Sequence, residues 1–195
     1  PAKVDIASEQ SAPDSAEPEE SASAPADMPE FDLTAYDVAL CGGEIHVFLN
    51  GKRQEVDIVE FLRSDSKKRT DDAKALYSHC MRNGMELKNV VFDAALAGYL
   101  LNVNSNDYSV ERLCAEYGAA YSAERLGESL FLLNRTLWEK LHAQGMYSVL
   151  TDIEIPLAEV LSSMEIEGIR LDTAALHQFG EEILPKIDEL AQDIY

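Results

Sequence analysis

The sequence predicts a helix-rich α/β fold that is followed by a long helical hairpin. Gly42-Gly43 separates two short segments with strand character, residues 37–41 and 44–49, and a two-residue glycine turn between such segments is typical of a β-hairpin. A short apolar strand, residues 90–92, precedes a helical pattern. Further along, leucines recur with the period of a helix, at positions 126, 130, 133, 137 and 141.

Local signals place the elements between the hairpin and the apolar strand. Asn50-Gly51 predicts a second turn, and residues 56–63 carry apolar side chains at helical spacing. Residues 64–70 are polar and are predicted to form a loop. Asp71 or Asp72 can cap the helix that follows, because aspartate is a favoured residue at that position.

Helices dominate the rest of the chain. Asp93 and Ser109 are predicted to cap two helices, and the leucine-rich helix closes at Gly145. In the hairpin, Leu157, Val160, Leu161 and Met164 are predicted to form one apolar face of the first helix. Asp172 caps the second helix, whose apolar pattern continues to the end of the sequence. We therefore expect the chain to be an internal part of a longer protein.

The charge is strongly acidic, with 16 Lys and Arg against 36 Asp and Glu. Residues 1–33 are rich in Ala, Ser, Pro and Glu and offer little to bury, which predicts a disordered acidic linker. Because the affinity of proteins for duplex DNA comes largely from Lys and Arg, the excess of acidic residues argues against binding of a phosphate backbone by this chain alone.

The cysteines and histidines do not predict a metal site or a disulfide framework. Cys41, Cys80 and Cys114 are odd in number and far apart, as expected for reduced thiols of a cytoplasmic protein. The four histidines share no ligand spacing. No signal peptide and no apolar run of membrane-spanning length is visible, so we expect a cytoplasmic location and no membrane partner.

Three stretches, taken in order, resemble bacterial DNA polymerase I, a family A polymerase. They are Phe-Asp-Ala-Ala-Leu-Ala-Gly-Tyr-Leu-Leu-Asn at 92–102, Ile-Glu-Ile-Pro-Leu at 153–157 and Met-Glu-Ile-Glu-Gly-Ile-Arg-Leu-Asp at 164–172. The resemblance covers about residues 45–195. It implies an incomplete ribonuclease H-like exonuclease-type domain at 34–146 and the truncated N-terminal helices of the polymerase domain at 147–195.

The same resemblance indicates which residues would do chemistry. Exonucleases of this family hold two metal ions between four carboxylates, since hard Mg²⁺ prefers oxygen ligands. Alignment on the family pattern places the third carboxylate at Leu76 and the last at Leu126, and the Tyr that precedes the last at Ser122. The first strand, Val38-Ala39-Leu40, supplies neither carboxylate of its pair. We therefore predict a degenerate domain with no catalytic, cofactor-binding or metal-binding residue.

Each of the other charged residues has both a structural and a functional interpretation. Asp93 lies at the end of a strand, and this position favours the role of helix N-cap over that of metal ligand. Asp71 and Asp72 are likewise interpreted as helix caps. Glu124 and Glu128 suit the positive end of the long helix. The basic run at 66–69 favours a solvated loop over a phosphate contact.

The functional prediction follows from the resemblance. The parent protein is expected to be a monomeric DNA-directed DNA polymerase that acts in replication and repair, on a DNA primer-template and with Mg²⁺ in its polymerase domain. This segment would lack both active sites and serve as a scaffold. Two alternatives stay open: an active 3′–5′ proofreading exonuclease that recruits Asp93 or Glu124, and a free-standing acidic adaptor that binds a protein through residues 153–194.

Overall fold

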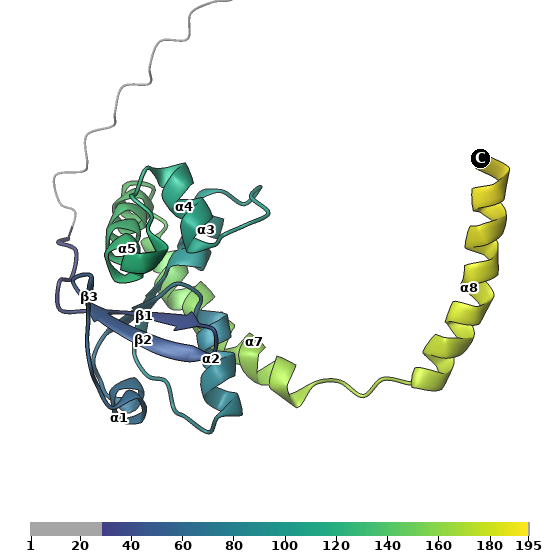
Figure 1. Cartoon of the computed structure of the whole chain (residues 1–195), viewed down its shortest axis with the longest axis horizontal. Helices are drawn as coiled ribbons and strands as arrows, with labels where there is room; N and C mark the ends of the chain where they lie inside the picture. Colours follow the sequence, from purple (N-terminus) through teal and green to yellow (C-terminus); the bar gives the residue numbers. More distant parts are fainter. Residues whose placement is uncertain (1–28, 195) are drawn as a thin grey trace, which may run out of the picture.

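The computed structural model describes residues 29–194, so most of the predicted linker lies outside the described residues. Within these residues, one sheet of five strands forms the centre, in the order β3-β2-β1-β4-β5. Figure 1 labels the first three strands, β1, β2 and β3. β1 pairs antiparallel with β2 and parallel with β4, and β4 pairs parallel with β5. The strands are β1 (Tyr36–Cys41), β2 (Glu44–Leu49), β3 (Lys52–Arg53), β4 (Lys68–Thr70) and β5 (Val90–Asp93). This arrangement confirms the predicted α/β class.

The predicted hairpin is confirmed, with Gly42 and Gly43 both at positive φ in the turn between β1 and β2. The prediction of a loop at 64–70 is wrong, because Lys68, Arg69 and Thr70 form the strand next to β1 and are all buried. Lys68 and Arg69 of the basic run are therefore not part of a solvated loop, whereas Lys67 just before β4 stays exposed and pairs with Asp32.

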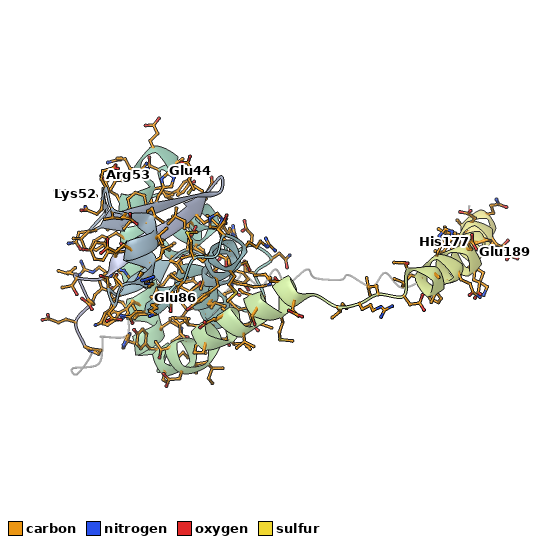
Figure 2. The ribbon with its side chains drawn as sticks, turned by 90° about the horizontal axis from the view of Figure 1, so that it is seen from below. Glu44, Lys52, Arg53, Glu86, His177 and Glu189 are labelled. Carbon is orange, nitrogen blue, oxygen red and sulfur yellow. The ribbon has the colours of Figure 1, made fainter. Side chains whose placement is uncertain are left out.

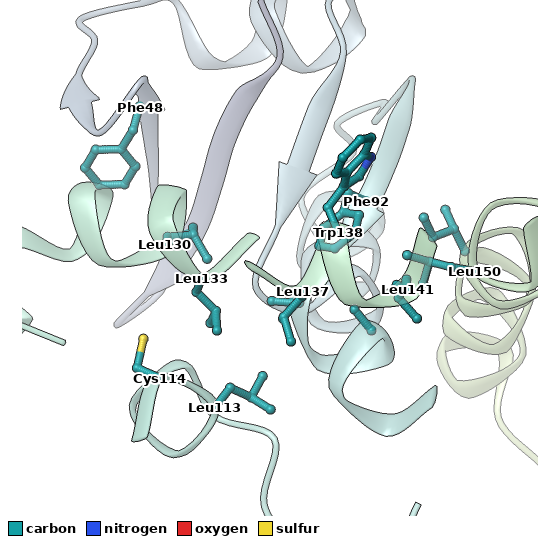
Figure 3. Close-up of a cluster of buried hydrophobic side chains, with 14 residues drawn as sticks. Phe48, Phe92, Leu113, Cys114, Leu130, Leu133, Leu137, Trp138, Leu141 and Leu150 are labelled. Atoms are coloured by element: carbon teal, nitrogen blue, oxygen red, sulfur yellow. The ribbon is translucent and has the colours of Figure 1, made fainter. Parts of the chain in front are cut away.

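Helices cover both faces of the sheet. Because side chains alternate along a strand, Ala39 and Phe48 face one helical layer whereas Val38 and Val47 face the other. The first layer contains α3 (Ala94–Leu101), α4 (Val110–Tyr117) and α5 (Leu126–Ala143), which begins after the short turn η1 (Ala123–Arg125). The second layer contains α1 (Ile58–Arg63) and α2 (Ala73–Arg82). The leucines of α5 form the centre of the first cluster, as their spacing predicted (Figure 3).

A continuous helical segment then crosses the body of the protein. It consists of α6 (Tyr147–Val149), a π-helical turn η2 (Leu150–Glu154) and α7 (Ile155–Glu167), which packs closely on α2. The apolar face predicted for this segment is not the face that packs on the body of the protein. Ile155, Ala158 and Ser162 are buried, whereas the four predicted apolar residues, Leu157, Val160, Leu161 and Met164, are all exposed.

The last helix, α8 (Thr173–Ile194), extends away from the body and contains no buried residue (Figures 1 and 2). Asp172 caps it as predicted, because its Oδ1 accepts a hydrogen bond from the Ala175 amide at 3.0 Å. Both helices of the predicted hairpin are thus present, but they do not pack against each other as a hairpin would. Among the helices of residues 29–194, none combines the length and the apolar character that a membrane span requires.

Candidate functional site

Three aspartates meet where β4 and β5 end. Thr70 pairs with Asp93 in the sheet, so Asp71 and Asp72 leave β4 beside the last residue of β5. The Asp93 carboxylate is 1% exposed and accepts hydrogen bonds from two backbone amides, those of Leu96 (2.7 Å) and Ala73. One amide belongs to the first turn of α3 and the other to that of α2. A single buried carboxylate therefore caps two helices.

The other two aspartates also contact backbone and neighbouring groups of these helix ends. Asp72 Oδ1 accepts a hydrogen bond from the Ala75 amide at 2.9 Å, and the Asp71 carboxylate accepts one from the Thr70 hydroxyl at 3.2 Å. Burial raises the pKa of Asp71, and it raises the pKa of Asp93 to about 7 against the opposing effect of the two amide donors. The caps predicted at Asp72 and Asp93 are confirmed.

The positions that the family pattern assigns to ligands do not come together. Leu76 is fully buried on α2, within the cluster that contains Val38. Leu126 is half-buried at the start of α5 and packs against the cluster on the opposite face of the sheet. The Ser122 amide donates to the Ser129 hydroxyl at 2.9 Å, and thus serves the local turn. Leu76 and Leu126 are separate core positions rather than the two walls of one cleft.

The acids at the start of α5 are exposed. Glu128 pairs with Arg125 at 3.1 Å, and Glu124 lies in the preceding turn η1. Within residues 29–194, no group of three or more His, Cys, Asp or Glu side chains is arranged to hold a metal ion.

Comparison with known proteins decides the family. Residues 39–124 match the family model described as DNA polymerase I, ribonuclease H-like domain. The chain is 27% identical over 185 residues to DNA polymerase I of Geobacillus stearothermophilus, covering 81% of this chain and 21% of that protein. The chain is of the DNA polymerase I type, with a ribonuclease H-like domain.

Further relatives agree with this assignment. The DNA polymerase I of Streptococcus pneumoniae strain TIGR4 is 31% identical over 160 residues, which cover 70% of this chain and 18% of the relative. A solved structure, described as the POL domain of Pol1 from M. smegmatis in complex with DNA primer-template and dNTP, shares the fold. Its TM-score is 0.68 at 21% identity, over 83% of this chain and 33% of that one. The chain spans about a fifth of the length of its curated DNA polymerase I relatives.

This DNA polymerase I-type domain contains a buried polar network that the sequence did not predict. The Arg69 guanidinium donates to both carboxylate oxygens of Asp37, at 2.8 and 3.1 Å, and the Asn134 amide donates to Asp37 at 2.8 Å. Burial raises the pKa of Asp37, whereas the charge and hydrogen bonds of Arg69 lower it. The network joins β1, β4 and α5. Asp37 is thus the carboxylate of the first strand in the structure, and it is already paired with an arginine.

Lys68, the neighbour of Arg69, points to the other face of the sheet. Its Nζ donates to the carbonyl oxygens of Ser64 and Ser66, each at 2.8 Å, and lies 5.1 Å from the centre of the Phe61 ring. Burial lowers the pKa of Lys68 to about 8. The lysine therefore binds backbone carbonyls after the end of α1 instead of a phosphate group.

Proposed function

We propose that the chain is a catalytically inactive, exonuclease-like scaffold within a DNA-directed DNA polymerase that acts in replication and repair. The observation that carries the proposal is leucine at 76 and 126, where the family pattern has carboxylates, because an apolar side chain cannot coordinate Mg²⁺. The carboxylates of Asp72 and Asp93 already serve as helix caps, which supports the same conclusion.

The scaffold role rests on how α7 is held. Ser162 is fully buried, and its hydroxyl oxygen lies 3.0 Å from the Lys74 carbonyl oxygen on α2 and 2.8 Å from the Ala158 carbonyl oxygen on its own helix, so that its one proton serves either acceptor. Lys74 also pairs with Glu165 at the surface. Small residues at 158 and 162 let the two helices approach closely, so α7 is a rigid extension of the domain. It would hold the polymerase domain at a set position relative to the exonuclease-like body.

The parent enzyme would carry out template-directed nucleotidyl transfer on a DNA primer-template, as a cytoplasmic monomer. Its Mg²⁺ ions would be held by residues outside this chain. The relatives named DNA polymerase I and the shared fold of the M. smegmatis Pol1 domain support this part of the proposal. Primer extension by the full-length product of the gene tests it, and an inert full-length product would contradict it.

Inactivity of the exonuclease-like domain is tested on the 195-residue chain. A 5′-labelled single-stranded oligonucleotide is incubated with the chain and Mg²⁺ or Mn²⁺, beside a proofreading exonuclease as positive control. We expect no shortening above the buffer control. The variants Asp93→Asn and Glu124→Gln are measured in parallel. Shortening by the unmodified chain that either variant abolishes would instead establish an active exonuclease that recruits that residue.

A further inference from the structure

The segment just before β1 lies on the body of the domain. The Phe31 ring is 4.4 Å from the Arg69 guanidinium carbon, and it meets the rings of Phe131 and Trp138 edge-on at 5.9 and 5.7 Å between centroids. Phe31 thus packs between an arginine of β4 and two aromatic side chains of α5. Such edge-on and cation–π geometries are favourable.

Polar contacts fix the same segment at three points. Arg69 donates to the carbonyl oxygens of Asp32 and Ala35, each at 2.8 Å. Lys67 Nζ lies 2.8 Å from the Asp32 carboxylate, and this partner together with the two Thr34 donors lowers the pKa of Asp32. The Arg69 guanidinium therefore pairs with Asp37 in the core and also binds the backbone of the segment that precedes β1.

The neighbouring residue behaves differently. The Leu33 side chain is 55% exposed although it is apolar and sits between the anchored residues. Backbone pairing with β4 begins at Tyr36, whose amide donates to the Lys67 carbonyl oxygen at 2.9 Å. Residues 31–35 are thus held by side chains of β4 and α5, whereas the strands behind them are held by a continuous backbone ladder.

We propose that residues 31–35 form a latch, which fixes the point where the acidic N-terminal segment leaves the domain and which can open without unfolding the sheet. Opening would uncover Phe131, Trp138 and one edge of Arg69, while the bond from Arg69 to Asp37 persists. Local opening of this kind is expected for a segment that side-chain contacts hold outside the backbone ladder and that leaves an apolar side chain, Leu33, exposed.

Trp138 provides a direct probe, because it is the single tryptophan of the chain and is 7% exposed. Quenching of its fluorescence by acrylamide is measured in the 195-residue chain, in Phe31→Ala and in Leu33→Ala. We expect Phe31→Ala to raise the quenching constant by at least about twofold by favouring the open segment. The matched variant Leu33→Ala removes an exposed side chain of the same segment and is expected to leave quenching unchanged.

Far-UV circular dichroism of the same samples shows whether each variant is folded, so that a change in quenching can be assigned to the folded protein. A folded Phe31→Ala with raised quenching supports the latch, and a smaller rise in Asp32→Ala, which removes the pair with Lys67, adds to that support. Unchanged quenching in a folded Phe31→Ala, or equal rises in both alanine variants at 31 and 33, would overturn it. Loss of the folded state in Phe31→Ala would overturn it as well, since the segment would then belong to the cooperative core.

Discussion

Arg69→Met is expected to lower the free energy of unfolding by about 3–5 kcal/mol, because it leaves the buried Asp37 carboxylate without its ionic partner. The loss is a large share of the roughly 5–15 kcal/mol that stabilises a typical domain. Both side chains of the pair are almost completely buried, so water cannot take the place of the guanidinium. Urea unfolding followed by circular dichroism at pH 7 measures the change.

Two variants control this experiment. Arg53→Met changes an exposed arginine of β3 and is expected to alter stability by no more than about 0.5 kcal/mol. The double variant Asp37→Leu/Arg69→Met removes the stranded charge together with its partner, and we expect it to recover about half of the loss. A loss below about 1 kcal/mol in Arg69→Met would show that the network does not stabilise the sheet.

Asp93→Ala is expected to lower the free energy of unfolding by about 3 kcal/mol, because it removes the buried cap of two helices at once. Asp93→Asn keeps one acceptor oxygen in the same place and should lose about half as much. The control Asp72→Ala removes a single cap, that of α2, which is more exposed than Asp93, and this variant should lower the free energy of unfolding by about 1 kcal/mol. Equal losses in Asp93→Ala and Asp72→Ala would contradict the double cap.

The effect of Asp93→Ala also depends on pH. Burial raises the pKa of Asp93 from 3.8 to about 7, so the folded state holds a proton that the unfolded state releases. The stabilising contribution of such a group is complete below pH ~4 and is lost as pH rises through 7. Asp93→Ala should therefore destabilise the protein more at pH 5 than at pH 8. The opposite order would show that the two amide donors outweigh burial.

Local signals were sufficient for the hairpin and the helix caps. Gly42-Gly43, Asp93 and Ser109 each act within a few residues of their own position, through a turn or through a hydrogen bond to a nearby amide. The family motifs were sufficient for the ribonuclease H-like domain. They could not show that Leu76 and Leu126 would lie on opposite faces of the sheet.

Strand β4 was missed because its stability comes from distant partners. Arg69 is buried only because Asp37 lies 32 positions earlier, and Asn134 completes the network from 97 positions beyond Asp37. The residues themselves read as a polar loop. The buried face of α7 was not identified from the sequence for a related reason. Helical spacing identifies an apolar stripe, but the small residues Ala158 and Ser162 decide where α2 can approach.

Binding of Mn²⁺ tests most directly whether the aspartates at the end of β4 and β5 cap helices instead of holding metal. The free ion is titrated by electron paramagnetic resonance with the 195-residue chain and with Asp93→Asn, at about 0.15 M salt to screen diffuse binding by exposed acids. We predict weak, unsaturable uptake that is the same for both proteins. Saturable binding of one or two ions that Asp93→Asn abolishes would contradict the account.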